Sequence, residues 1–317
     1  MLFPPFLQVR LTHGKGFSAE WYVQGGETMY YAFVVNPAAG TGYALRAMEK
    51  LETRLRAEKK EYRIIYTEKP GHASEIAAAL SADNEVSAVI SVGGDGTAGE
   101  VAAGLTGSDK PMGIIPAGTG NDFIKSAGIP NDPDQALDMI LNGTARKIDT
   151  GTVNDRFFLN VCGTGFDVTV LDYAESEKEK HRGLTPYFLG LIKAIFHYKS
   201  VCLDLSVDGV QEKGLYLICS IANGQYIGGG IPICPAADIE DGKLDLVLIR
   251  NIHRWQIPFY LPGLMMSKDL SFRITRHRKV SEIIIRGQNL RINIDGDIVS
   301  MDHAVFRINP GSLYLVR

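Results

Sequence analysis

The sequence predicts an α/β domain with a doubly wound parallel sheet, followed by a second domain with an antiparallel β-sandwich. The first domain is expected over residues 29–150, where short β-rich runs alternate strictly with helical periodicities. The second is expected over residues 151–317, where short strands follow one another at even spacing, with turn signals between them. Because parallel sheets bind ligands at the carboxyl ends of their strands, we expect the functional site there.

The composition indicates a globular protein of two domains without a nucleic-acid partner. The chain has 317 residues, which is long for one hydrophobic core, and 45% of them are hydrophobic and 22% charged. A net charge of −3 provides no basic field that would collect a phosphate backbone. No stretch of the sequence is long and apolar enough to span a membrane. We therefore expect a cytoplasmic protein that binds no nucleic acid.

The cysteines favour free thiols in a reducing compartment. They lack CxxC spacing and lie in apolar, strand-like contexts, so we expect them buried and bound neither in disulfides nor to zinc. The four are Cys162, Cys202, Cys219 and Cys234.

Residues 1–28 are expected to form an extension before the first domain. They contain neither the apolar segment and cleavage site of a signal peptide nor a convincing amphipathic pattern. Met29 directly precedes the first strong strand and is our candidate for the native start. A genuine but loosely docked arm is the alternative, and the sequence does not separate the two.

The elements of the first domain follow from its periodicities and turn residues. Strands are expected at 30–35, 62–66, 86–92 and 112–116, and helices at 43–59, 73–80, 97–105 and 134–142, with one more helix between the loop 117–123 and Gly128. Strict alternation implies right-handed crossovers between parallel strands. Three loops rich in Gly, Asn and Thr then fall at the carboxyl ends of strands, at 36–42, 93–97 and 117–122.

The second domain is expected to consist mostly of strands. A hairpin is predicted from 148–153 and 156–162, because Asn154-Asp155 is a polar two-residue turn. Further strands are expected at 201–207, 214–222, 244–250, 270–275, 279–286, 290–294 and 304–308, and helices at 166–180, 186–198 and 253–266. The last run, 312–316, fits a strand of either domain.

The first motif with a chemical meaning is Gly93-Gly94-Asp95-Gly96-Thr97, between a predicted strand and a predicted helix. Its glycines allow backbone N–H groups to approach a phosphate closely. Asp95 would repel that phosphate unless a divalent cation lay between them, so the motif points to a nucleotide–metal site and a kinase. A structural hairpin is the alternative; the strand–turn–helix context and Glu100, one helical turn after Thr97, favour the nucleotide site.

A second loop, Gly118-Thr119-Gly120-Asn121-Asp122-Phe123, follows the next predicted strand. Thr119 and Asn121 are good helix N-caps, and capping alone would explain them. The recurrence of a Gly-rich loop at the adjacent strand favours a phosphate cradle shared by both loops.

Three motifs in this order resemble the soluble diacylglycerol kinase catalytic family, which includes bacterial lipid kinases and sphingosine-type kinases. They are Val34-Val35-Asn36-Pro37 with Gly40, the Gly93–Thr97 loop, and Pro116-Ala117 with the Gly118–Phe123 loop. The resemblance runs from about Tyr30 to the C-terminus. It implies an ATP-dependent lipid kinase that uses Mg²⁺ and phosphorylates a lipid hydroxyl, foremost that of diacylglycerol to give phosphatidic acid.

The resemblance also implies roles for individual residues. Thr67, the Gly94–Glu100 loop and Thr119 match positions that contact ATP, and Asn36 lies in the first nucleotide-facing loop. In the acidic turn 238–245, Asp241 would be a carboxylate ligand of a structural Mg²⁺, with Asp238 and Lys243 at the flanking positions, Lys243 through its carbonyl. Without the resemblance, a solvated acidic β-turn explains this segment almost as well.

The candidate catalytic base lies near the C-terminus. Asn293-Ile294-Asp295-Gly296-Asp297 is similar to the family's Asn-x-Asp-Gly-Glu motif but has Asp297 where Glu is usual. This departure leaves open whether Asp295 or Asp297 accepts the proton of the hydroxyl. Asp95 would organise metal-bound water or assist that base. Taken alone, an Asp-Gly pair in this context is a common hairpin turn.

The lipid is expected to enter between the domains, presented at a membrane surface to which the protein would bind peripherally. Candidate walls are the segments 186–198, 224–232 and 255–266, each of which fits a hydrophobic core as well. The basic run Arg273, Arg276, His277, Arg278 and Lys279 could contact an anionic membrane or simply be solvated. Whether the chain forms a homodimer is left open.

Two other functions remain open at this point. NAD kinases also use a Gly-Gly-Asp-Gly-Thr loop with a β-rich second domain, and the Asn36-Pro37 and Gly118–Phe123 segments favour lipid kinases over them. A non-catalytic lipid-binding regulator on the same fold is the second alternative, which the acidic residues at positions 95, 241, 295 and 297 disfavour.

Overall fold

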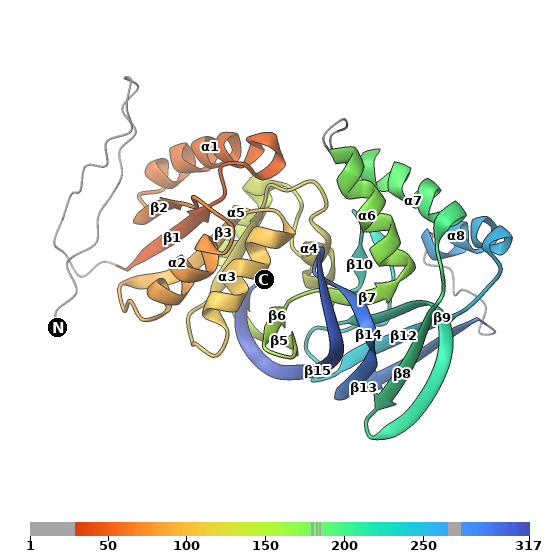
Figure 1. Cartoon of the computed structure of the whole chain (residues 1–317). Coiled ribbons are helices and arrows are strands. Elements are labelled where there is room, and N and C mark those ends of the chain that lie inside the picture. Colours follow the sequence, from red (N-terminus) through yellow and green to blue (C-terminus); the bar gives the residue numbers. More distant parts are fainter. Residues whose placement is uncertain (1–28, 179–180, 182, 184, 266–273) are drawn as a thin grey trace.

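The structure is a computed structural model that describes residues 29–178, 181, 183, 185–265 and 274–317 (Figure 1). The predicted extension 1–28 and most of the predicted strand 270–275 lie outside the described residues. None of the helices within the described ranges is long and apolar enough to cross a bilayer.

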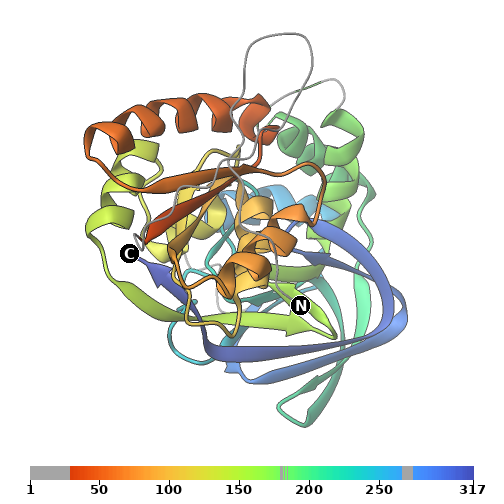
Figure 2. The same cartoon turned by 90° about the vertical axis from the view of Figure 1, so that its left-hand side faces the viewer.

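The N-terminal part is a parallel sheet in the order β2-β1-β3-β4 with helices on both faces (Figures 1 and 2). Its strands are β1 Tyr30–Val35, β2 Tyr62–Tyr66, β3 Val86–Gly93 and β4 Met112–Pro116. Its helices are α1 Tyr43–Ala57, α2 His72–Ser81, α3 Asp95–Leu105, α4 Asp122–Ala127 and α5 Pro133–Asn142, with a 3-10 turn η1 at Ala39–Thr41. The apolar run of β3 is almost wholly buried, as expected for a central parallel strand covered on both faces.

The C-terminal part is antiparallel, as predicted. Its strands are β5 Ala145–Val153, β6 Arg156–Phe158, β7 Val161–Gly165, β8 Val201–Val207, β9 Val210–Ala222, β10 Tyr226–Ile227, β11 Ile231–Pro232, β12 Leu244–Arg250, β13 Thr275–Val280, β14 Glu282–Ile294 and β15 Asp297–Val316. Its helices are α6 Phe166–Lys178, α7 Thr185–His197 and α8 Ile257–Met265, with a 3-10 turn η2 at Arg254–Gln256.

The long strand β15 joins the two parts into one continuous sheet. Its first half pairs with β14, and its last residues pair antiparallel with β5 and parallel with β4, where Leu315 lies opposite Met112. Leu313 and Leu315 consequently belong to the hydrophobic core of the parallel sheet. A second core lies between the antiparallel strands, where Phe158 and Phe306 pack edge to face, and a third lies between these strands and α6 to α8.

The observed elements differ from the predicted ones where contacts between distant segments determine where a strand or helix begins and ends. The predicted strand 156–162 is interrupted at Leu159 and Asn160, because their amides turn away from strand pairing to bind Asp295. The predicted strands 279–286 and 290–294 are parts of β13 and β14, and β14 continues through a register shift after Arg286. The predicted helix 253–266 begins as η2 and continues as α8. All four cysteines are free, but Cys202 is exposed rather than buried.

Candidate active site

Three loops meet at the carboxyl ends of the parallel strands. The amide of Ala117, after β4, donates to the carbonyl of Gly93 at the end of β3 over 2.7 Å. Gly94 and Gly118 approach so closely that a Cβ atom on Gly118 would overlap the Cα atom of Gly94. In the loop after β1, Gly40 has a φ of +57°, and a Cβ there would overlap the carbonyl oxygen of Ala117. The glycines are therefore required for the loops to lie against one another.

The N-terminus of α3 opens into this loop cluster. Asn36 donates from Nδ2 to Thr97 Oγ1 over 3.1 Å, which ties the loop after β1 to the first turn of α3. A Cβ on Gly93 would overlap the same threonine hydroxyl. The first N–H groups of a helix lack partners within the helix and lie at the positive end of its dipole. The cluster can therefore bind a phosphate through backbone N–H groups.

Asp95 begins α3 and lies within the cluster. Its Oδ1 accepts a hydrogen bond from the amide of Phe123 at 3.0 Å, which connects the first and second Gly-rich loops. Burial raises the pKa of Asp95, and the charge of Asp122 acts in the same direction. An Asp95 carboxylate in this position would gain from a cation, since its water shell is largely removed.

Asp122 and Lys125 also belong to this region, although the sequence reasoning did not select them. Asp122 is buried; it forms an ion pair with Lys125 at 2.8 Å and accepts the amide of Gly229 at 2.8 Å. Gly229 follows β10, so this contact joins the second Gly-rich loop to the C-terminal part. The feature of the sequence that could have identified Asp122 is its position inside the Gly118–Phe123 motif.

Asp295 reaches the cluster from the C-terminal part. Its carboxylate accepts three backbone amides, from Leu159 at 2.6 Å, Asn160 at 3.0 Å and Val161 at 2.9 Å. A Cβ atom on Gly99 of α3 would lie 4.0 Å from Asp295 Oδ2, so the carboxylate lies against the first turns of that helix. Burial raises the pKa of Asp295 to about 6; the three amides oppose this, and the charge of Asp95 adds to it.

Asp297, the other candidate base, has a different environment. It lies opposite Ile294 at the start of β15, just beyond the turn formed by Asp295 and Gly296. Its side chain is exposed and forms no hydrogen bond or ion pair with any residue that the structure describes. The structure thus places the carboxylate of Asp295 against α3, whereas the side chain of Asp297 is exposed.

Three further residues were predicted to lie at the nucleotide site: Thr67, Thr119 and Asn121. Thr67 lies beside Asn36, since its amide donates to the carbonyl of Val35 at 2.9 Å. Thr119 is exposed at the rim of the second loop. Asn121 adopts a positive φ of 49° and closes its own loop, accepting from the amide of Gly118 and donating to its carbonyl.

Glu100 differs from its expected position. We expected it to face the nucleotide loop, but its carboxylate accepts the amides of Gly71 at 2.8 Å and Ala73 at 3.1 Å. These amides belong to the N-terminus of α2, where a negative charge is favourable. Glu100 therefore connects α3 to the start of α2.

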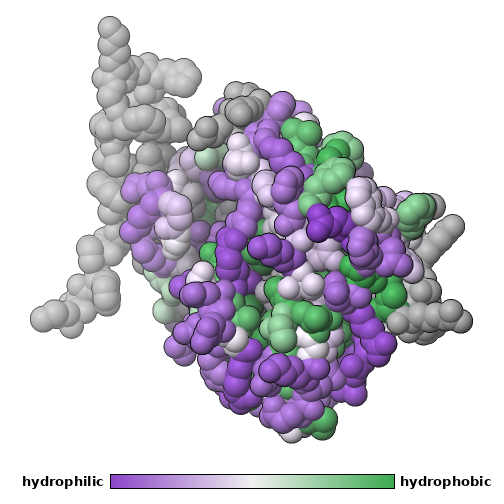
Figure 3. All heavy atoms as spheres, turned by 45° about the vertical axis from the view of Figure 1, so that its right-hand side comes forward, coloured by the Kyte–Doolittle hydropathy of each residue, from purple (hydrophilic) through white to green (hydrophobic). Residues whose placement is uncertain are grey.

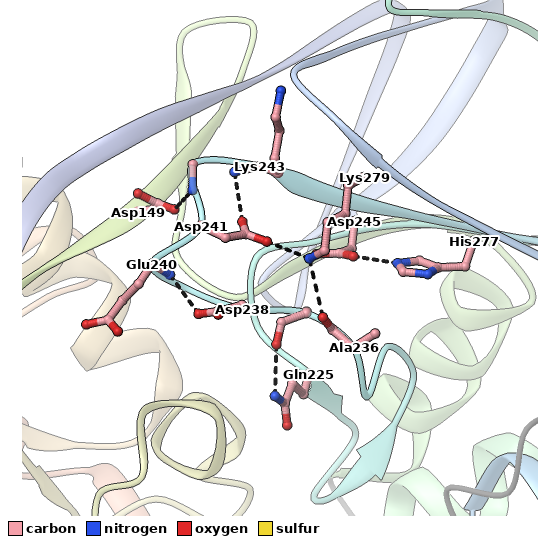
Figure 4. Close-up of polar contacts among 12 residues, drawn as sticks. Asp149, Gln225, Ala236, Asp238, Glu240, Asp241, Lys243, Asp245, His277 and Lys279 are labelled. Carbon is pink, nitrogen blue, oxygen red and sulfur yellow. Dashed lines mark hydrogen bonds and ion pairs between the residues drawn. The ribbon is translucent and has the colours of Figure 1, made fainter.

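The acidic turn predicted to hold a metal lies between β11 and β12 (Figure 4). Asp238 accepts the amide of Glu240 at 3.0 Å. Asp241 accepts the amide of Lys243 at 2.9 Å and forms an ion pair with Lys279 at 2.5 Å. The Lys243 side chain extends away from these carboxylates to Ser281 Oγ, so only its carbonyl oxygen is available as a ligand.

The donor set of this turn fits a hard cation. Asp149, which accepts the amides of Gly242 and Gly311, has a pKa raised by burial and further by the charges of Asp241 and Asp238. Three carboxylates thus concentrate negative charge around one turn, and magnesium prefers such oxygen ligands. Lys279 already supplies one positive charge to Asp241, so a metal would compete with it.

Comparisons with known proteins show which family and fold this chain resembles. Residues 30–153 match the family model described as "Diacylglycerol kinase catalytic domain", and residues 160–317 match "YegS C-terminal NAD kinase beta sandwich-like domain". A diacylglycerol kinase of Mycobacterium tuberculosis is 28% identical over 291 residues, which cover 90% of this chain and 94% of that protein. A "Probable lipid kinase YegS-like" of Yersinia enterocolitica is 35% identical over 206 residues, covering 63% and 67%.

Solved structures share the fold. A crystal structure of a diacylglycerol kinase from Bacillus anthracis superposes with a TM-score of 0.67 at 20% identity, over 92% of this chain and 98% of that one. A second crystal structure from the same organism superposes with a TM-score of 0.76 at 23% identity, with the same coverage. At these identities the likeness concerns the fold.

Proposed function

The chain belongs to the diacylglycerol kinase catalytic family of lipid kinases, and from this premise we propose that it phosphorylates the hydroxyl of diacylglycerol. The lipid oxygen would form a bond to the γ-phosphorus of ATP while the bond from that phosphorus to the bridging oxygen of ADP breaks. The hydroxyl proton would pass to a carboxylate of the protein. The products are phosphatidic acid and ADP.

The position of Asp295 against α3, near Asp95, supports the proposal. A general base works best when its pKa lies near the working pH, and burial raises the pKa of Asp295 to about 6. The three amides around it hold the carboxylate in one orientation. We therefore assign the base to Asp295 and not to Asp297, whose side chain is exposed and unpaired among the described residues. This choice resolves an alternative that the sequence leaves open.

ATP is proposed to bind across the three loops. The backbone N–H groups at the start of α3 and in the loop of Gly118 would receive its phosphates. Asn36, Thr67 and Thr119 line the approaches to these groups, and Thr119 is exposed and available to bind the nucleotide. Glu100 and Asn121 support the loops through their own contacts.

Magnesium is proposed in two roles. With the nucleotide it would neutralise charge on the phosphates, and Asp95 is the residue of this chain placed to hold it or its bound water. At the acidic turn, the Asp241 carboxylate, with Asp238 and the carbonyl oxygen of Lys243 at the flanking positions, would hold a structural ion that stiffens the turn before β12.

A kinase assay tests the proposal against its alternatives. The full chain is incubated with γ-labelled ATP and, in separate reactions, dioctanoylglycerol, sphingosine and NAD, and the products are identified by mass spectrometry. Labelled phosphatidic acid supports the proposal. Labelled NADP would instead support an NAD kinase, whereas transfer to no acceptor at millimolar ATP and Mg²⁺ would favour a non-catalytic lipid-binding protein.

A further inference from the structure

Helices α7 and α8 lie on the side of the C-terminal part remote from α2 (Figure 1), and they carry exposed apolar side chains. Nine large hydrophobic side chains are exposed in the described part of the chain, and five of them lie on α7, η2 and α8. These five are Phe188, Ile192, Phe196, Trp255 and Phe259, which we call the apolar platform. Figure 3 shows apolar residues gathered on the face where α7 and α8 come forward.

The platform consists of two sets of side chains, one on α7 and one on η2 and α8, each at an interval of four residues. Phe188, Ile192 and Phe196 follow one another at intervals of four along α7, so they form one exposed stripe. Trp255 and Phe259 show the same interval across η2 and α8, and Phe259 is 82% exposed. The opposite faces of these helices contribute to the hydrophobic core beside β9 and β12, so the outward stripes are not needed for that packing.

Fixed contacts hold the two sets together. Tyr198, just after α7, donates from its hydroxyl to the carbonyl of Ile252 over 2.6 Å. Arg254 donates from Nη1 to the carbonyl of Phe196 over 3.3 Å. The ring of Tyr198 also packs edge-on against Phe166, with 5.7 Å between the ring centres. The end of α7 and the start of η2 are therefore one rigid unit.

A polar groove of about 460 Å³ is formed by the residues that follow α7 and by those before and within η2. Its lining includes Lys199 and Arg254, and neither forms an ion pair within the described ranges of the chain. The groove is lined by Tyr198, Lys199, Ser200, Asn251, Ile252, His253, Arg254 and Gln256, and so offers cations, a hydroxyl and amide groups next to the apolar platform.

The basic run 273–279, which the sequence suggested for membrane contact, differs from the groove because several of its residues form ion pairs within the protein. Arg276 is paired with Glu212, and Lys279 with Asp241 and Asp245. His277 contacts the buried carboxylate of Asp245. Arg278 is exposed and its side chain forms no hydrogen bond or ion pair with another described residue, and Arg273 lies outside the described residues. Arg276, His277 and Lys279 are therefore engaged within the protein, whereas Lys199 and Arg254 lie together in the groove without a carboxylate partner among the described residues.

We propose that the apolar platform and its groove form a docking site for an anionic phospholipid bilayer. The aromatic side chains would enter the boundary between headgroups and acyl chains, where Trp and Phe are favoured, while Lys199 and Arg254 bind the phosphodiester of a lipid headgroup. The charge complementarity of the groove selects a bilayer over a neutral apolar partner. The inference deepens the proposed function, because a lipid kinase meets its substrate in a bilayer.

Vesicle binding tests the site without any catalytic step. The full chain is sedimented without ATP with vesicles of phosphatidylcholine alone or with one third phosphatidylglycerol. Two cations near an anionic surface predict roughly 10- to 30-fold tighter binding to the anionic vesicles, reduced by added salt. Equal binding to both compositions, or none to either, would overturn the proposal.

Substitutions in the groove and in the apolar platform test which residues contact the bilayer. Lys199→Gln with Arg254→Gln should remove most of the preference for anionic vesicles, and Lys50→Gln, an exposed change on α1, should not. Phe188→Ser with Phe259→Ser should weaken binding to both kinds of vesicle about tenfold or more, because each exposed ring would no longer leave water. The matched control Val210→Ser changes a side chain that is 62% exposed at the start of β9. Losses no larger than those of the controls would contradict the site.

Fluorescence gives a direct measure of insertion. The chain has two tryptophans, so Trp255 is the only one left in a Trp21→Phe variant. Brominated acyl chains should quench its emission in anionic vesicles, and Phe196→Ser beside it should reduce the quenching. Unquenched emission with bound protein would rule out insertion of this face.

Activity separates this inference from the proposed function. With a short-chain, monomeric diacylglycerol, the Lys199→Gln/Arg254→Gln variant should match the unmodified chain, but with diacylglycerol in anionic vesicles its rate should fall in parallel with binding. Vesicle binding without any kinase activity would refute the proposed substrate and leave the docking site intact. Full activity on vesicles by this variant would refute the docking site alone.

Discussion

The carboxylate of Asp95 lies near enough to that of Asp295 for the charge of Asp95 to raise the pKa of Asp295. The two residues are far apart in the sequence. Asp95 begins the first helix after a Gly-rich loop, and Asp295 lies in the hairpin between β14 and β15. One belongs to the parallel sheet and the other to the antiparallel part, so the site is complete only when both are folded. A pair of carboxylates with different surroundings can divide metal binding and proton transfer between them.

The pH dependence of turnover should report Asp295. As a base it acts only when ionised, so log kcat/KM should fall with unit slope as the pH drops below about 6. The effect of Asp295 on the stability of the fold has the opposite sign. Because its pKa is higher in the folded state, the folded state binds more protons than the unfolded state between about pH 4 and 6. The free energy of unfolding therefore decreases over this range as the pH rises, and the contribution is lost once the pH passes 6. Rates from pH 5 to 8, with Tm at each pH, check both trends. A rate that is flat down to pH 5 would contradict the assignment.

Asp295→Asn and Asp297→Asn should separate the two candidate bases. Loss of a general base lowers rates by roughly 10²- to 10⁴-fold, so Asp295→Asn should lose at least a hundredfold in kcat. Asp297→Asn should stay within a fewfold of the unmodified chain, since its side chain is exposed. Circular dichroism and Tm confirm that both variants are folded. The reverse order of effects would move the base to Asp297.

Gly118→Ala should disrupt the nucleotide loops. The added Cβ would overlap Gly94, and relieving it should separate the loops at a cost of about 1–3 kcal/mol. We expect a clear rise in KM for ATP. Ala79→Ser, an exposed change on α2, is the control. Equal KM values for the two variants would show that the close contact of the loops does not matter for ATP.

Glu100→Ala should act on stability more than on nucleotide binding. Removing the carboxylate leaves the amides of Gly71 and Ala73 without their acceptor, which should lower the free energy of unfolding by about 1–2 kcal/mol. Glu100→Gln retains an acceptor oxygen and should lose less. Urea unfolding and KM for ATP measure the two effects. A large rise in KM with unchanged stability would instead restore the nucleotide contact expected from the sequence.

Magnesium should stabilise the acidic turn through Asp241. A ligand that binds only the folded state at 100 times its Kd adds about 2.7 kcal/mol, so Mg²⁺ should raise Tm and EDTA should reverse the rise. Asp241→Asn should abolish this shift. Lys279→Met should increase it, because Lys279 now competes for Asp241. Measurements without nucleotide isolate this turn from the active site, and an unchanged Mg²⁺ response in Asp241→Asn would exclude it as the metal site.

Much of the fold could be predicted because its signals are local. Strand 86–92 is a continuous apolar run and is buried as β3, and the Gly-rich turn after it begins α3 as expected. Glycine spacing likewise predicted that the loops after β3 and β4 would carry the site, because only Gly permits the contact between Gly94 and Gly118. Asp122 was not selected, since only its ion pair with Lys125 and its contact with Gly229 reveal its position.

The sequence by itself determined the order of strands and helices, the Gly-rich loops and the family. Only the tertiary structure shows that three backbone amides hold Asp295 while Asp297 is exposed, that Glu100 binds the start of α2, and that Arg276, His277 and Lys279 of β13 pair with carboxylates. The physical reason is the range of the interactions. Periodicity and turn geometry act over a few residues, whereas the partner of a charged side chain depends on which distant segments packing brings beside it.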